Sequence, residues 1–345
     1  SPAELFSIQQ AVGWSSAEPL IMWNPPWTLS LILPFGLLDF TVGQFLWLLA
    51  QVSCVLISAQ ALWRIYGVNG NNDVNGHAAA GRWTPWLLGL TFVPTGFVLI
   101  LGQITPVILL GLTGLLYFER KENDFALGAA IAILAIKPHL VYLFWIVLVF
   151  WIWQFKQWRV ALGAAVAGTC AAVIPLILDP RVYSEYFALH RMDGITKPFE
   201  WPAPTLGNAF RILFHFDGDG LQLVPSLMAV VWVLCYWRRR KQDWQWSEQL
   251  PLIILVSVTS NFFVWTYDQV VFLPALIQGA SWLVRQRAAW FRSMAALLYI
   301  AINIAHFVVR FFVADELWYF WLAPSLLIAY LVHRREAEGQ KSATS

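Results

Sequence analysis

Residues 256–277, which read VSVTSNFFVWTYDQVVFLPALI, place polar side chains between two long apolar runs. Asp268 is the carboxylate of this stretch, and Trp265, Tyr267 and Gln269 flank it. A carboxylate between two runs of membrane length is costly unless it faces water, a partner or a substrate. Such a group can orient a hydroxyl or assist as a base. Asp268 is therefore the first candidate functional residue.

Several cationic or polar side chains could serve an anionic, partly apolar ligand near this carboxylate. Ammonium, guanidinium and imidazole groups can neutralise a phosphate. The candidates are Lys137, His139, Arg211, His306 and Arg310. Lys137 and Arg310 also stand near the ends of apolar runs, where long side chains snorkel to lipid headgroups. His306 is flanked by apolar residues, which favours packing within a bundle, and the amide of Gln103 could bond a neighbouring helix.

One long polar loop, residues 179–220, carries aromatic residues among its charges. Loops of this length are usually functional or disordered, and the aromatic content argues against disorder. An interfacial helix is predicted from the i, i+3, i+4, i+7 spacing of Tyr183, Tyr186, Phe187 and His190. A second helix is predicted after Pro204, with Thr205 as its cap, and it presents Asn208 and Arg211.

The composition indicates what elements must hold these residues. Of 345 residues, 59% are hydrophobic and 12% charged, which is typical of a multi-pass membrane protein. We expect an all-α bundle with about 10–12 membrane segments, formed as one domain over residues 1–345 with 179–220 as an extracytoplasmic loop. The apolar runs are 42–63, 83–118, 125–136, 140–153, 160–178, 221–237, 250–264, 270–284, 294–312 and 318–332. The run 83–118 is broken at Pro94, Thr95 and Gly96.

The distribution of basic residues predicts the orientation. If every basic cluster is cytoplasmic, the spans from Phe125 onward alternate without a violation. The clusters are Arg120 with Lys121, Lys156 with Arg159, Arg238 to Lys241, Arg285 with Arg287 and Arg292, and Arg334 with Arg335. This arrangement puts Gln103, Lys137, His139, the long loop, 265–268 and Arg310 on the outer face of the plasma or inner membrane. Because the positive charge is scattered, no nucleic-acid partner is expected.

Five short motifs, in order along the chain, resemble those of glycosyltransferase family 87. They are NPPWTLSLILPFGLL (24–38), Gly102-Gln103 before an apolar run, Lys137-Pro138-His139, PTLGNAFRIL (204–213) and WTYDQVVFLPAL (265–276). The resemblance spans nearly the whole chain, while each motif is weakly specific by itself. Their order and shared side of the membrane carry the resemblance.

The resemblance implies a GT-C-type, multi-pass glycosyltransferase that uses a polyprenyl-phosphate sugar. Such an enzyme moves a hexose, with mannose the best-known in the family, to a lipid or glycan acceptor on the extracytoplasmic side and typically inverts the anomeric centre. It needs no cofactor, since the lipid-linked sugar is a substrate, and no metal is expected. Membrane lipids surround it. Substrate contacts are expected from Gln103, Lys137, His139, Asn208, Arg211, Trp265, Tyr267, Gln269 and Arg310, with Asp268 catalytic.

The chain departs from the family's pattern near its start. The family's first span and acidic general base should lie upstream of Asn24, where the acids here are Glu4 and Glu18. Neither stands in the expected context, and the chain opens without Met. We therefore expect an upstream piece to be missing, and the general base either to be missing with it or to lie elsewhere in the chain.

Two other functions remain open. A transporter or lipid flippase would also carry charges inside the membrane, but it should place them at mid-membrane depth and show paired half-sequences. We find no convincing internal repeat, and the polar residues favour one face. A non-catalytic subunit of a polysaccharide-assembly complex is the third possibility if the base is absent.

Overall fold

The computed structural model describes residues 2–15, 19–67, 83–191, 201–215, 220–285, 289–313 and 315–344. Within these ranges the regular elements are all helices, which confirms the all-α prediction. In chain order they are α1 (Pro2–Ala11), η1 (Pro26–Thr28), α2 (Leu29–Gly36), α3 (Phe40–Tyr66), α4 (Thr84–Thr91), α5 (Val93–Ile100), α6 (Thr105–Arg120), α7 (Asp124–Leu134), η2 (Pro138–Val141), α8 (Tyr142–Phe155), α9 (Trp158–Leu178), α10 (Val182–Leu189), α11 (Leu206–Leu213), α12 (Gly220–Arg240), η4 (Lys241–Asp243), α13 (Trp246–Thr259), η5 (Thr266–Phe272), α14 (Leu273–Arg285), α15 (Ala289–Phe312), η6 (Glu316–Tyr319) and α16 (Leu322–Thr344).

Five helical stretches in the described chain are long and apolar enough to cross a membrane. They are Phe40–Tyr66, Pro138–Phe155, Trp158–Leu178, Gly220–Asp243 and Ala289–Phe312. The predicted runs at 125–136 and 250–264 form the shorter helices α7 and α13. At 1.5 Å per residue, α7 is only about 16 Å long and cannot cross a bilayer of about 30 Å alone. The predicted segments thus include partial spans.

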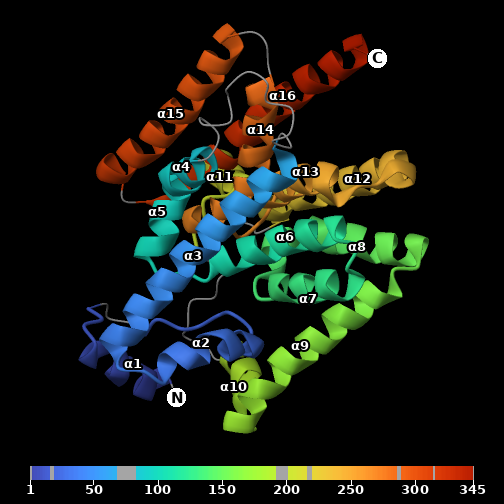
Figure 1. Ribbon diagram of the computed structural model, residues 1–345. Coiled ribbons are helices and arrows are strands. Elements are labelled where there is room, and N and C mark those ends of the chain that lie inside the picture. The colour runs from blue at the N-terminus through green and yellow to red at the C-terminus, as the bar shows by residue number, and fades with distance from the viewer. Residues whose placement is uncertain are drawn as a thin grey trace.

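The centre of the molecule is a layer of helices that run side by side (Figure 1). Helices α6, α8, α12 and α13 cross the middle, and α3 passes over them. Their contacts are filled by fully buried side chains such as Leu112, Phe144 and Trp246, and the rings of the last two lie 5.1 Å apart. α9 and α15 lean away from this centre on opposite sides.

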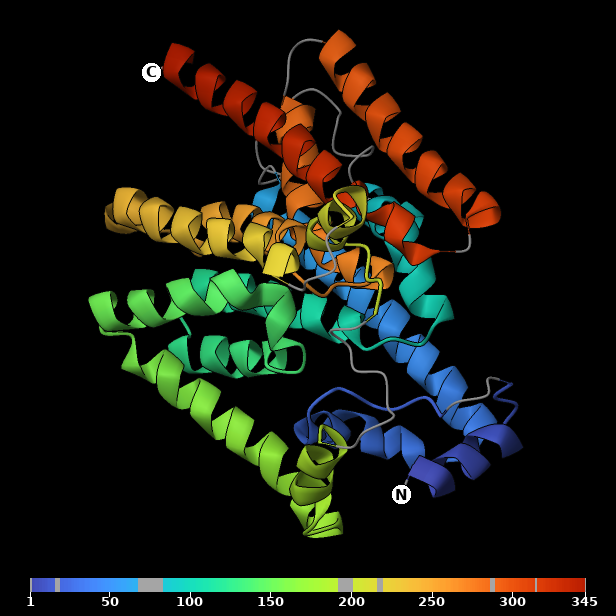
Figure 2. The ribbon, with the colours of Figure 1, turned by 180° about the vertical axis from the view of Figure 1, so that it is seen from behind.

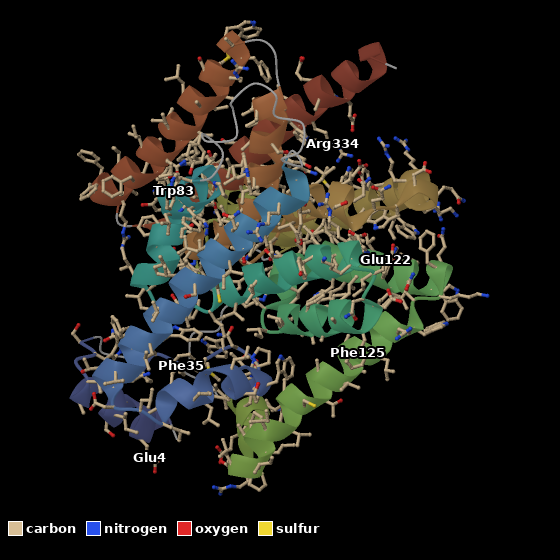
Figure 3. The ribbon with its side chains drawn as sticks, in the orientation of Figure 1. Glu4, Phe35, Trp83, Glu122, Phe125 and Arg334 are labelled. Atoms are coloured by element: carbon tan, nitrogen blue, oxygen red, sulfur yellow. The ribbon has the colours of Figure 1, made fainter. Side chains whose placement is uncertain are left out.

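Helices α7 and α9 approach closely because each has a glycine at the crossing. A Cβ on Gly128 would collide with the backbone of Val160, and one on Gly163 would collide with the carbonyl of Phe125. Phe125, labelled in Figure 3, lies where the two helices meet. Small residues allow membrane helices to pack backbone to backbone. This contact holds α7, and therefore Lys137 just after it, against the rest of the bundle.

The apolar run 83–118 is broken, as its sequence predicts. α4 ends at Thr91, Phe92 is extended with ψ of 114°, and Pro94 lies in the first turn of α5. The side-chain oxygen of Asn303 accepts a hydrogen bond from the freed Val93 amide at 2.8 Å. Gly102 then turns the chain with φ of +62°, a region that favours glycine, before α6 begins at Thr105. Because of these breaks, Thr105, the first residue of α6, lies at the end of the bundle.

Both short helices predicted in the 179–220 loop are present. α10 carries Tyr186, whose hydroxyl donates to the Trp23 carbonyl at 3.0 Å. α11 is capped by Thr205, whose hydroxyl accepts from the Asn208 amide at 3.2 Å. Figure 2 shows α11 on the face opposite to α3. Residues 192–200 and 216–219 of this loop, and 68–82 of the earlier polar loop, lie outside the described ranges.

Helix α15 stands partly apart from the bundle. The hydroxyl of Tyr299 on α15 lies 3.1 Å from that of Thr91 on α4. Together with α14 and α16, α4 and α15 line a cavity of about 380 Å³. Its walls are almost entirely apolar, formed for instance by Leu88, Ala296 and Leu326. Such walls suit hydrocarbon and offer few partners to a polar substrate. The candidate site must lie elsewhere.

The predicted cytoplasmic ends of several helices meet at what we call the basic end. There Arg120 donates to the carbonyl of Arg64 at 3.3 Å, and Gln154 donates to that of Lys241 at 3.5 Å. Glu119 accepts hydrogen bonds from the amides of Trp246 and Ser247 at 2.8 and 3.1 Å. These contacts bring the ends of α3, α6, α8, η4 and α13 together.

Candidate functional site

A buried ion pair lies at the opposite end of α6 from the basic end. Lys137 Nζ is 2.7 Å from Asp268 Oδ1, and the two side chains are 7% and 1% exposed. The hydroxyl of Thr105 donates to the same carboxylate oxygen at 2.7 Å and accepts from Lys137 at 3.3 Å. We call these three residues the ionic cluster. α6 has 16 residues, so the cluster is about 24 Å from the basic end.

Each member of the ionic cluster comes from a break in helical structure. Thr105 is the first residue of α6, Lys137 lies between α7 and η2, and Asp268 lies in η5. Proline after Thr105 and after Lys137 helps to set these boundaries, because proline suits the first turn of a helix and disfavours the helical conformation before it. Three loops distant in sequence thus meet at one point.

The carboxylate of Asp268 accepts three hydrogen bonds from its neighbours. Its second oxygen accepts from the backbone amide of Trp265 at 3.2 Å, in addition to the two bonds on Oδ1. Lys137 Nζ also lies 5.1 Å from the centre of the Tyr267 ring, a cation–π contact. An ammonium has three donors, and the cluster uses two, so one remains for a ligand. The geometry suits Lys137 as an anion-binding group that Asp268 holds in place.

A set of polar contacts fixes the loops that carry the pair. Asn261 donates to the carbonyl of His139 at 2.5 Å and accepts from the amide of Phe263 at 2.9 Å. Ser257 donates to the carbonyl of Leu140 at 2.9 Å. Because these bonds join the end of α13 to η2, they set the distance between the Lys137 and Asp268 loops.

Other predicted site residues lie beside the cluster. Trp265 and Tyr267 flank Asp268, and Gln269 is 1% exposed with no partner for its side-chain oxygen among the described residues. The His139 ring lies 5.6 Å from that of Phe263, and its Nε2 is likewise without a described partner. Gln103 is half-buried in the turn that leads to Thr105. The motif at 24–38 also reaches this region, since Trp27 donates to the Ala135 carbonyl at 3.1 Å.

The remaining predicted residues lie on α11 and α15. Asn208 is buried and donates to the carbonyl of Ala203 at 2.9 Å, and Arg211 lies on the same helix, α11. Arg310 is exposed at the end of α15. His306, four residues before Arg310 on α15, packs among aromatic rings, and its ring centroid lies 4.6 Å from that of Tyr319.

Three contributors to this region were not among the predicted site residues. Thr105 and Asn261 form hydrogen bonds to residues distant in sequence, to Asp268 and to the His139 carbonyl. The only local signal for Thr105 is its position two residues after the Gly102-Gln103 motif. Glu316 is the third, since its carboxylate accepts from Thr266 at 3.5 Å. Burial raises the pKa of Glu316 and the nearby Arg310 opposes that rise. Of the early acids, Glu4 is exposed on α1 and Glu18 lies outside the described residues.

The fold and the site together define a multi-pass membrane protein with a buried charged cluster at one end of its bundle. The family model of Glycosyltransferase family 87 matches residues 23–260, and the chain belongs to this family. The matched part includes Thr105 and Lys137, and Asp268 follows it. No curated protein and no solved structure matches the chain. Family membership makes it a membrane glycosyltransferase, which confirms the resemblance seen in the sequence.

Proposed function

We propose that the protein transfers a hexose, such as mannose, from a polyprenyl phosphate to a lipid or glycan acceptor on the extracytoplasmic side of the cell membrane. The observation that supports this most is the Lys137–Asp268 pair, buried at the end of the bundle opposite to the basic end. A lipid-linked phosphate presents its negative charge at the membrane surface, where this ammonium can meet it. The lipid-linked sugar is a substrate, and the reaction calls for no cofactor.

In the proposed reaction an acceptor hydroxyl attacks the anomeric carbon of the sugar. The bond from that carbon to the phosphate oxygen breaks, and the polyprenyl phosphate leaves with the electron pair. Lys137 offers its remaining N–H to the phosphate as its negative charge grows. Asp268, held by three hydrogen bonds, orients Lys137 and balances its charge. The acceptor proton passes to a base outside the ionic cluster.

Residues around the cluster are assigned to the substrates in the same proposal. His139, Trp265, Tyr267 and Gln269 adjoin the pair and would contact the sugar. Gln103, Asn208, Arg211 and Arg310 lie on neighbouring elements and would contact more distant parts of the donor or acceptor. These assignments are testable one side chain at a time.

The test is sugar transfer by the membrane-reconstituted protein from radiolabelled polyprenyl-phosphate sugars into a membrane lipid extract. Asp268→Asn should lower transfer by about a hundredfold or more, because it removes a charge that positions the phosphate-binding group. Lys137→Ala should weaken donor binding more than acceptor binding, whereas Lys121→Ala, an exposed lysine at the basic end, should change neither. Unchanged transfer by both cluster variants would refute the proposal. Lipid-linked sugar crossing the bilayer without transfer would favour a flippase.

A further inference from the structure

A continuous series of aromatic rings, half-buried except for the exposed His190, leads away from the ionic cluster. We define the aromatic strip as Tyr267, Trp265, Phe263, Trp201, Trp23 and His190. These residues come from the loop after α13, from η5, from the segment before α11, from the chain before η1 and from the end of α10. Four separate stretches of chain, which hold Trp23, His190, Trp201 and residues 263–267, thus contribute rings to one series of contacts, several of them edge-to-face.

Each ring of the strip contacts the next. The Tyr267 and Trp265 rings are nearly parallel, with centroids 6.3 Å apart, and Trp265 lies 5.7 Å from Trp201. Trp201 lies 6.5 Å from Trp23, which lies 5.3 Å from His190. Phe263 touches both Trp201 and Trp265, at 6.1 and 6.0 Å. The strip begins at the ring that Lys137 contacts, so it is continuous with the site of the proposed reaction.

The chemistry of the strip suits a sugar chain. The C–H face of a pyranose ring is apolar and packs on aromatic rings, while its hydroxyls need hydrogen-bond partners at the edge. Two polar atoms near the inner part of the strip have no partner among the described residues: the side-chain oxygen of Gln269, two residues after Tyr267, and the Nε2 of His139, whose ring contacts Phe263. A buried polar atom without a partner is costly, and a hydroxyl of a bound sugar would satisfy it.

The arrangement differs from an aromatic belt that anchors a protein in lipid. Belt residues lie around the perimeter of a bundle, as Trp153 does, which is 75% exposed. The strip is instead held together by tertiary contacts. Tyr186 on α10 donates to the Trp23 carbonyl at 3.0 Å, and its ring lies 4.6 Å from that of His190. Such support is expected of a preformed binding surface, in which apolar rings are combined with a few polar groups.

We infer that the aromatic strip binds the acceptor, and that the acceptor is a glycan with several sugar rings rather than a bare lipid or a protein hydroxyl. The sugar that receives the transfer lies at Tyr267 beside the ion pair, and the preceding sugars lie along Trp265, Trp201 and Trp23 towards α10. This inference rests on the proposed function, whose donor side it leaves unchanged.

The experiment separates acceptor binding from donor binding and needs no turnover. The purified protein in nanodiscs is titrated with α-linked mannotetraose, cellotetraose and the corresponding monosaccharides, with intrinsic tryptophan fluorescence and calorimetry as readouts. A tetrasaccharide should bind at least tenfold more tightly than its monosaccharide. Trp201→Ala should weaken tetrasaccharide binding roughly three- to tenfold, as expected for the loss of one aromatic contact. Trp153→Ala, at an exposed ring far from the strip, is the matched control.

Donor binding is measured in parallel with a polyprenyl phosphate. Trp201→Ala should leave it unchanged, while Lys137→Ala should weaken it and spare tetrasaccharide binding. Trp201→Phe, which keeps an aromatic ring, should restore much of the glycan affinity and so distinguish ring stacking from a folding defect. Failure of the wild type to bind either tetrasaccharide, or equal losses in Trp201→Ala and Trp153→Ala, would overturn the inference. Glycan binding without polyprenyl-phosphate binding would instead overturn the proposed donor.

Discussion

Lys137 and Asp268 show how two charges are accommodated inside an apolar bundle. Removing an ammonium and a carboxylate from water costs several kcal/mol per ion, which their attraction offsets only when geometry and further hydrogen bonds are favourable. Here Thr105 and the Trp265 amide supply the further bonds. A pair that is so costly to bury and contributes little net stability is best explained by function, because it presents a fixed positive charge to a ligand.

The pair should behave as a unit in unfolding experiments. Lys137→Met leaves the Asp268 carboxylate buried without its cation, so we expect it to lower the free energy of unfolding by about 3–5 kcal/mol. The double variant Lys137→Met/Asp268→Asn should lose less unfolding free energy than Lys137→Met alone, although both variants should be inactive in sugar transfer. Denaturant or thermal unfolding in detergent checks this. Additive losses in the double variant would show that the two groups are not coupled.

At the scale of elements, Glu119 of α6 caps another helix. Its two carboxylate oxygens accept from the amides of Trp246 and Ser247, the first residues of α13. The first amides of a helix lack partners within it, and a negative charge there also favours the helix dipole. Since α13 ends beside the loop that carries Asp268, this cap at the basic end also helps to position the site.

Loss of this cap should loosen the start of α13. Glu119→Ala should cost about 0.5–2 kcal/mol, the range for losing a helix cap. Glu119→Gln keeps one acceptor oxygen and should cost less. Hydrogen exchange at the amides of the first turn of α13 provides the readout. Equal protection of those amides in Glu119→Ala and the wild type would rule out a capping role.

The close crossing of α7 and α9 can be tested with two glycines of α9, one at the crossing and one away from it as a control. Gly163 of α9 has no room for a side chain against Phe125, whereas Gly168, five residues later on the same helix, has nothing near its Cβ position. Gly163→Ala should therefore destabilise the protein, by roughly 1–3 kcal/mol as in overpacked cores.

Gly168→Ala should be neutral or slightly stabilising, since alanine is the better helix former. Thermal unfolding of the two variants side by side measures the difference. If Gly163→Ala and Gly168→Ala lower the melting temperature equally, Gly163 is not required for the close approach of α7 and α9. Transfer activity should fall with Gly163→Ala, because α7 leads directly to Lys137.

For the whole molecule, the separation of the ionic cluster from the basic end predicts sidedness. With Cys54, Cys170 and Cys235 replaced, Ser184→Cys on α10 should react with a membrane-impermeant maleimide in intact cells. Lys121→Cys at the basic end should react only after permeabilisation, as positive charge favours the cytoplasm. Both positions are exposed, so accessibility differs only by the side of the membrane. The reverse labelling pattern would invert the proposed orientation.

The sequence by itself determined the class of the molecule. Long apolar runs require helices that satisfy their own backbone in lipid, which predicts an all-helical membrane protein. Local signals were also sufficient for the break at Pro94, for α10 and for the Thr205 cap of α11, since each depends on residues a few positions apart. The ordered motifs were enough to identify the family.

Only the tertiary structure decided which polar residues meet. Lys137 and Asp268 are 131 residues apart, and Thr105 joins them from a third loop. The positions of the loops that carry these residues depend on the glycines at the α7–α9 crossing and on the contacts of Asn261. Neither of these features can be read from a local sequence pattern. The same holds for the aromatic strip, whose rings each resemble belt residues in the sequence. Periodicity reports what one segment needs to bury, whereas a site depends on distances between segments, which packing alone determines.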